Sequence, residues 1–100
     1  MTLREVLDAA AAEAGVSAEV GADGGLAWAA GGSVFAALDQ TDSTASFRLD
    51  PELAAAARRT PDVSASLRGT EWVEFRPSAP DDHAADRAAA WFLAALRRAV

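Results

Sequence analysis

The chain has 100 residues with 51% hydrophobic side chains, but 27 of these are alanines, so the large apolar side chains suffice for one small core and one domain, residues 1–100. The absence of cysteine excludes a disulfide framework and a thiolate metal site. The net charge of −6 arises in residues 1–50, which hold eight acids and two arginines, so the chain lacks the basic footprint of a typical duplex-binding domain.

Targeting signals are also missing from the sequence pattern. No segment reaches the roughly 20 consecutive apolar residues that a membrane-spanning helix needs. The first ten residues are too polar for a secretion signal. We therefore expect a soluble cytoplasmic protein with no membrane partner.

The first predicted element is a helix over residues 2–14. Thr2 and Glu5 have capping-box spacing, in which each side chain accepts a hydrogen bond from the other residue's amide. Gly15 fits the left-handed position just past the helix end. Apolar residues recur at helical spacing, namely Leu3, Val6, Leu7, Ala10, Ala11 and Ala14.

Residues 26–38 predict a β-hairpin, because Gly31 and Gly32 supply the positive φ angles of a tight turn. A regular two-residue turn places Trp28 directly opposite Phe35 on one face. The same register gives the pairs Ala30–Ser33 and Leu26–Ala37, and it gives the other face Ala27, Ala29, Val34, Ala36 and Leu38. Since neither face is polar, we expect both to be covered, or one to meet a partner.

The second half continues with a strand, a helix, a strand and a helix. Residues 44–49 alternate as a strand does, Asp50 and Pro51 then cap and open a helix that Thr60-Pro61 ends, and residues 62–69 form a connector. Residues 71–76 form the next strand. Asp81 or Asp82 caps the last helix, which runs to about Arg98 and buries a stripe of Ala85, Ala88, Phe92, Ala95, Leu96 and Ala99.

The predicted order is therefore α-β-β-β-α-β-α. Strands that follow each other through short turns favour an antiparallel sheet. We expect a single α+β domain with an antiparallel sheet of about four to five strands covered by helices.

Candidate catalytic and metal-binding residues are few. His83, the only histidine, follows Asp81 and Asp82 and precedes Asp86. Zinc needs three or four converging ligands, which one histidine beside such aspartates rarely supplies. Acids at the start of a helix instead satisfy its free amides. No serine lies in a G-x-S-x-G motif. The glycines at 21–25 precede a strand and so do not indicate a phosphate loop. We expect no catalytic residue, no metal and no cofactor.

The better candidate site is one face of the sheet. Thr44, Ser46 and Arg48 share a side of one strand, and Trp72, Glu74 and Arg76 share a side of another. The candidate binding face is Arg48, Trp72 and Arg76, where an aromatic ring and forked guanidinium donors could stack on a base or dock a peptide. The alternative is a solvated sheet face on which Trp72 lies under a loop or helix.

Several short motifs carry a family resemblance. The segments GGSVFAALD, ASFRLDPELAAAARRTPDV and EWVEFRP resemble the MmcQ/YjbR-like family, through Gly31–Leu38, Phe47–Ala54 and Trp72-Val73. The resemblance implies a CyaY-like fold and a protein without established enzymatic activity, often labelled DNA-binding by analogy of shape. The chain departs from the pattern at Ser33-Val34, where the family often has a lysine, and in its last helix.

The function predicted from the sequence is therefore a non-catalytic binding domain. DNA is the partner that the resemblance implies and the net charge of −6 disfavours. A protein-partner or self-association module, including a homodimer, is the alternative. An enzyme with an unrecognised site is the third class.

Overall fold

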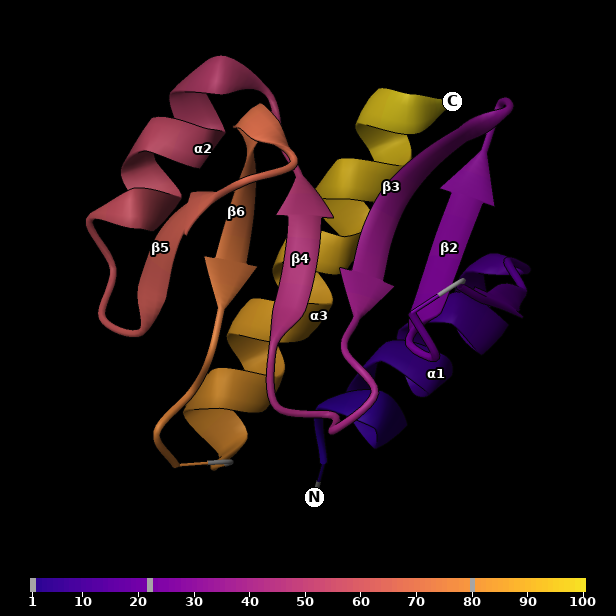
Figure 1. Ribbon diagram of the computed structural model, residues 1–100, viewed down its shortest axis with the longest axis horizontal. Coiled ribbons are helices and arrows are strands. Elements are labelled where there is room, and N and C mark those ends of the chain that lie inside the picture. Colours follow the sequence, from indigo (N-terminus) through magenta and orange to yellow (C-terminus); the bar gives the residue numbers. More distant parts are fainter. Residues whose placement is uncertain (1, 22, 80) are drawn as a thin grey trace.

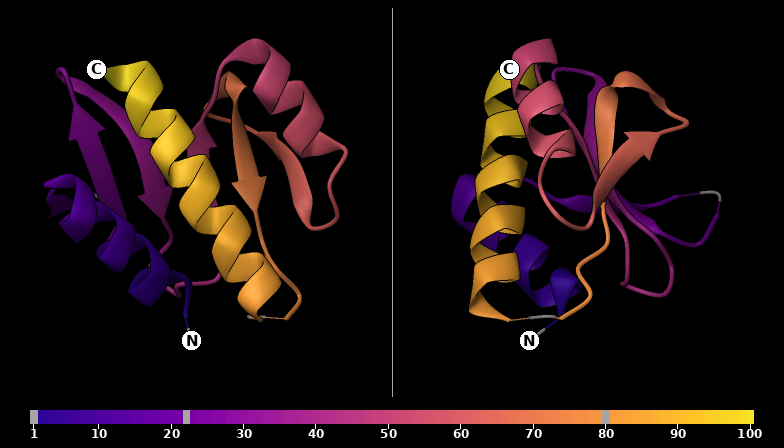
Figure 2. Two further views of the ribbon diagram at one scale, coloured as in Figure 1. Left: turned by 180° about the vertical axis from the view of Figure 1, so that it is seen from behind. Right: turned by 90° about the vertical axis from the view of Figure 1, so that its left-hand side faces the viewer.

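The structure, a computed structural model, describes residues 2–21, 23–79 and 81–100 (Figure 1). Within these ranges three helices and six strands follow in the order α1 (Leu3–Ala14), β1 (Ala18–Val20), β2 (Leu26–Ala30), β3 (Ser33–Leu38), β4 (Ala45–Arg48), α2 (Pro51–Arg58), β5 (Val63–Ser66), β6 (Gly69–Phe75) and α3 (Asp82–Ala99). The strands form one antiparallel sheet in the order β1-β2-β3-β4-β6-β5. All the described helices lie on one face of it (Figure 2).

The helices begin and end where local sequence signals predict. The Glu5 amide donates to Thr2 Oγ1 at 3.1 Å and the Thr2 amide donates to Glu5 Oε1 at 2.9 Å, which confirms the capping box. Gly15 ends α1 with φ 76°. Asp50 caps α2 by accepting from the Glu52 amide at 3.0 Å. None of the described helices is long and apolar enough to cross a lipid bilayer.

The β2–β3 hairpin has the predicted Gly31-Gly32 turn but a different register. A β-bulge leaves Phe35 as an extra residue, so Trp28 pairs with Ala36 and the predicted Trp28–Phe35 pair is wrong. The bulge also shifts Leu26 from Ala37 to Leu38, and it turns Ala36 and Leu38 toward the helices, opposite to the prediction. Its physical reason is the core, because Trp28 and Phe35 both pack edge-on against Phe92.

Two strands were not predicted, so the predicted element order and strand number are wrong. β1 is three exposed residues without alternation. β5 lies in the segment predicted to be a connector, and it pairs with β6 through a hairpin turn at 67–68. Both are short strands at the edges of the sheet, where burial imposes little hydrophobic alternation. The α+β class and the antiparallel sheet are as predicted.

The core lies between α3 and the middle of the sheet. Phe92 is fully buried against Trp28 and Phe35, with ring centroids 5.5 and 5.2 Å apart respectively. Trp91 packs on Phe75 at 5.2 Å. Alanines fill the remaining contact surface of α3 and let the helix lie close to the strands. The helices thereby seal one face of the sheet and leave the other to solvent.

Candidate functional site

The open face of the sheet has a row of residues that crosses every strand. From β1 to β5 the strand register aligns Glu19, Ala27, Ala37, Ser46, Glu74 and Ser64. The residues in the middle of this row have small side chains. Ala37 and Ser46 are only 4% and 7% exposed to solvent, although no described helix covers them. They therefore lie at the bottom of a depression.

This depression, which we call the sheet-face pocket, has a volume of about 240 Å³. Its lining residues are Asp23, Ala37, Leu38, Asp39, Thr44, Ser46, Arg68, Glu74 and Arg76. Three carboxylates and two guanidiniums surround the small residues, so the walls carry both signs of charge. Asp23 and Arg68 come from connecting loops at opposite sides of the sheet, which is why strand alternation alone did not identify them.

Arg76 is the predicted site residue that lines the pocket. Its Nε donates to Thr44 Oγ1 at 2.9 Å, so two residues predicted to share this face are in contact. The Arg76 amide donates to the Asp62 carbonyl at 2.9 Å, which fixes the backbone at the end of β6. The guanidinium is thus held beside the pocket with nitrogen atoms that can donate to a ligand.

Trp72 lies next to the pocket, half-buried, with the guanidinium carbon of Arg68 at 5.2 Å from its ring centroid. This is the geometry of a cation–π contact. One face of the indole is therefore occupied by a side chain from the β5–β6 turn. The contact also places the Arg68 guanidinium at the pocket wall.

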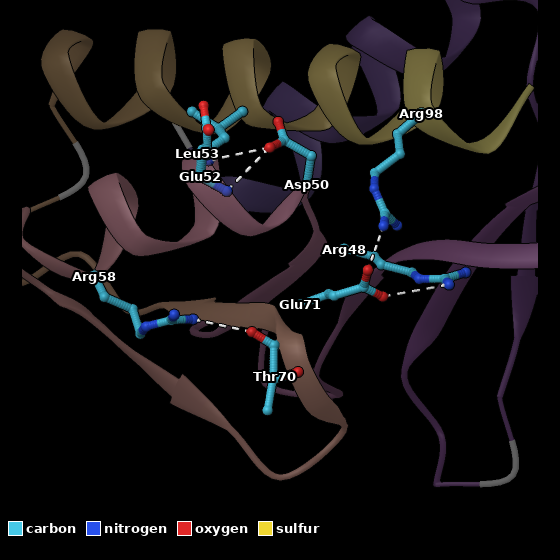
Figure 3. Close-up of polar contacts among 8 residues, drawn as sticks. All are labelled: Arg48, Asp50, Glu52, Leu53, Arg58, Thr70, Glu71 and Arg98. Carbon is cyan, nitrogen blue, oxygen red and sulfur yellow. Dashed lines mark hydrogen bonds and ion pairs between the residues drawn. The ribbon is translucent and has the colours of Figure 1, made fainter.

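Arg48 is not among the described residues that line the pocket. Its Nη2 lies 3.5 Å from Glu71 Oε2, and the other carboxylate oxygen of Glu71 pairs with Arg98 (Figure 3). Arg58, at the end of α2, donates to the Thr70 carbonyl at 3.2 Å. Arg48, Arg58 and Arg98 thus already have polar partners within the protein.

Asp39 organises the rim of the pocket at the turn between β3 and β4. Its Oδ1 accepts from the amides of Ser43 and Thr44, and its Oδ2 accepts from the hydroxyls of Thr41 and Ser43. Burial raises the pKa of Asp39, but these hydrogen bonds lower the pKa more, so that it lies below the ordinary value. Because this carboxylate accepts four hydrogen bonds, it stabilises the turn at the rim and is a weak base.

The predicted start of α3 also has a structural account. Asp81 accepts from the Ala84 amide at 2.9 Å, and the helix begins at Asp82. His83 is exposed and lines a separate cavity beside Asp62 and Arg87. Within residues 2–21, 23–79 and 81–100, no three His, Cys, Asp or Glu side chains converge in a way that could hold a metal ion.

No protein-family model and no curated protein sequence matches the chain. Among solved structures, it is similar to a protein from Pseudomonas syringae determined by the Northeast Structural Genomics Consortium. The two share a TM-score of 0.70 over 100% of each chain, with 10% of residues identical. At this identity the likeness shows the fold alone.

Proposed function

We propose that this chain is a small non-catalytic binding domain that takes an extended segment of another protein on the open face of its sheet. The observation that carries this proposal is the sheet-face pocket, whose bottom is Ala37 and Ser46 and whose walls carry both charges. Small residues let the backbone of a ligand approach the sheet closely. Carboxylates and guanidiniums beside it supply acceptors and donors for the amides, carbonyls and side chains of a peptide.

DNA is the weaker candidate partner. Phosphate binding requires several unneutralised cations on one surface. Arg48 and Arg98 both pair with Glu71, while Arg76 and Arg68 stand among the carboxylates of the pocket. The relation to the MmcQ/YjbR-like family, from which the DNA-binding label came, stays a prediction. An enzymatic role has less support, because the single histidine, His83, lines another cavity and the pocket carboxylate of Asp39 is committed to hydrogen bonds in its own turn.

Selection of peptides from a random library tests this proposal. An extended chain spans about 3.3 Å per residue, so about ten residues are enough to cross the molecule. Selected peptides are synthesised, and their affinities are measured by calorimetry for the wild type and two variants. Ser46→Gln places a longer side chain in the pocket, while Ser64→Gln makes the same change at the exposed end of the same row.

We expect Ser46→Gln to weaken peptide binding at least about tenfold, which is about 1.4 kcal/mol, and Ser64→Gln to leave it within about twofold. Failure to enrich any peptide, or equal affinities for the two variants, would contradict the proposal. A duplex of DNA is titrated in parallel. Saturable duplex binding that weakens steeply with salt, and that Ser46→Gln reduces, would favour the DNA alternative instead.

A further inference from the structure

A groove lies in the helical layer, on the side of the molecule away from the sheet-face pocket. It runs between α1 and α3, which start at the same edge of the molecule and lie side by side (Figure 2, left). Its volume is about 400 Å³. The apolar lining includes Val6 and Ala9 from α1 and Ala89 and Leu93 from α3. We call it the α1–α3 groove.

The shape of the groove suits a helix. Four of the six apolar residues in its walls are alanine, and helices with small side chains at the contact approach to about 8 Å between axes. Leu93 is 37% exposed, although it is a large apolar residue, and Val6 is half-buried beside it in the same groove. A helix with apolar residues at positions i, i+3, i+4 and i+7 would cover these side chains.

The charge of the groove selects the kind of helix. Glu5, Glu13 and Asp86 line it, and none of the described lining residues is basic. Arg4, one position before Glu5, is directed to Asp8, with Nε 3.8 Å from Oδ2. The apolar strip is therefore flanked by carboxylates at both ends. Lysine or arginine side chains beside the apolar face of an incoming helix would meet them.

A second copy of this chain does not offer such a helix. Among the described helices, α1 has one arginine and three acidic residues, and α2 has one arginine and one acidic residue. In the last turn of α3, Arg98 is already paired with Glu71. Two chains of net charge −6 also repel each other. The same net charge attracts a cationic partner at long range. The occupant that fits is therefore a different protein.

We propose that the α1–α3 groove docks a cationic amphipathic helix of a partner protein, with its apolar face on Val6, Ala89 and Leu93 and its basic side chains against Glu5, Glu13 and Asp86. This surface is separate from the sheet-face pocket. The two sites share no lining residue, so either can be tested and can fail without the other.

The test uses two designed helical peptides with identical leucine positions, one with lysines beside the apolar face and one with glutamates in their place. Each is titrated into isotope-labelled protein at about 0.15 M salt, where exposed charges more than about 8 Å apart are screened. Amide shifts map the binding surface, and calorimetry gives the affinity. The protein variants are Ala89→Arg, in the groove, and Ala90→Arg, the neighbouring exposed alanine outside it.

We expect the lysine peptide to shift amides of the groove residues, and Ala89→Arg to weaken its binding at least about tenfold while Ala90→Arg changes it less than about threefold. Ser46→Gln should leave this binding unchanged. The proposal is overturned if the lysine peptide shifts no groove amides, if the glutamate peptide binds as tightly, or if both alanine variants have the same effect. Should Ala89→Arg not fold, Glu13→Lys on the exposed rim tests the same charge requirement.

Discussion

Arg98, in the last turn of α3, pairs with Glu71 of β6, and this pair joins the last helix to the strand beside the sheet edge β5 (Figure 3). The second carboxylate oxygen of Glu71 lies 3.5 Å from Arg48 at the end of β4. One carboxylate thereby connects two neighbouring strands and the helix that covers them. The helix-end arginine has a specific partner in addition to its favourable position near the helix dipole.

Glu71→Gln should lower the free energy of unfolding by about 1 kcal/mol, because it removes a charge shared by two guanidiniums that remain partly exposed to solvent. The loss is measured by urea unfolding and should shrink at about 1 M salt, where screening is strong. Glu19→Gln, on the exposed edge strand β1, is the matched control and should change stability by less than about 0.5 kcal/mol. Equal effects of the two substitutions would show that the Glu71 pairs contribute nothing.

The hairpin turn between β2 and β3 gives a second test, because its two glycines differ in one respect. Both have positive φ, 59° at Gly31 and 83° at Gly32, so alanine at either position costs about 1–2 kcal/mol. A Cβ at Gly31 would also lie 2.8 Å from the carbonyl oxygen of Ala99, while a Cβ at Gly32 would meet nothing within 4 Å.

Gly31→Ala should therefore lower the melting temperature clearly more than Gly32→Ala does. Each further kcal/mol corresponds to about 4–8 °C in a domain of this size. Thermal unfolding of the two variants side by side measures the difference. If the two melting temperatures agree, the hairpin and the end of α3 separate at no cost, and the close approach does not constrain the turn.

The helices could be predicted from the sequence because their signals are local. The capping box of Thr2 and Glu5, and the cap at Asp50, depend on neighbouring residues only. The bulge at Phe35 could not be predicted in this way. It exists because Trp28 and Phe35 must both reach Phe92, which lies more than 50 positions later in the sequence.

The candidate site was predicted only in part, because strand alternation is a local signal and some of the pocket residues come from distant loops. Strand alternation predicted Ser46 and Arg76 on one polar face, and both line the sheet-face pocket. It gave no information on Asp23 and Arg68, which reach the pocket from loops. Alternation also gave the position of Arg48 in its strand, but a long side chain can turn toward any neighbouring charge. Here Arg48 contacts the carboxylate of Glu71.

Asp39→Asn tests the turn at the rim of the sheet-face pocket through its pH dependence. Because hydrogen bonds hold the pKa of Asp39 below its ordinary value, the ionised carboxyl stabilises the folded state above the unfolded-state pKa of about 3.9. That contribution is lost as pH falls through the lower pKa of the folded state. The variant should therefore be less stable than the wild type near pH 7, and the gap should narrow below about pH 4.

Urea unfolding of both proteins at several pH values measures this gap. Asp42→Asn, in the same turn, is the control, because no hydrogen bond to the Asp42 carboxylate is among the contacts of the described residues. A gap for Asp39→Asn that stays constant from neutral to acidic pH would mean that the carboxylate charge is not what stabilises the turn.

Phe92 and Leu93 are adjacent in α3 and should respond very differently to truncation. The Phe92 ring is fully buried and contacts Trp28 and Phe35, so Phe92→Ala leaves a cavity on the sheet at a cost of about 3–5 kcal/mol. Leu93 is partly exposed in the α1–α3 groove, so Leu93→Ala should cost less than about 1 kcal/mol. A small domain is stable by only about 5–15 kcal/mol, so Phe92→Ala approaches the limit of folding. Phe92→Leu keeps most of the side-chain volume, so its loss of stability in urea unfolding should lie between those of Phe92→Ala and Leu93→Ala. If Phe92→Ala destabilises the protein no more than Leu93→Ala does, Phe92 is not at the centre of the core.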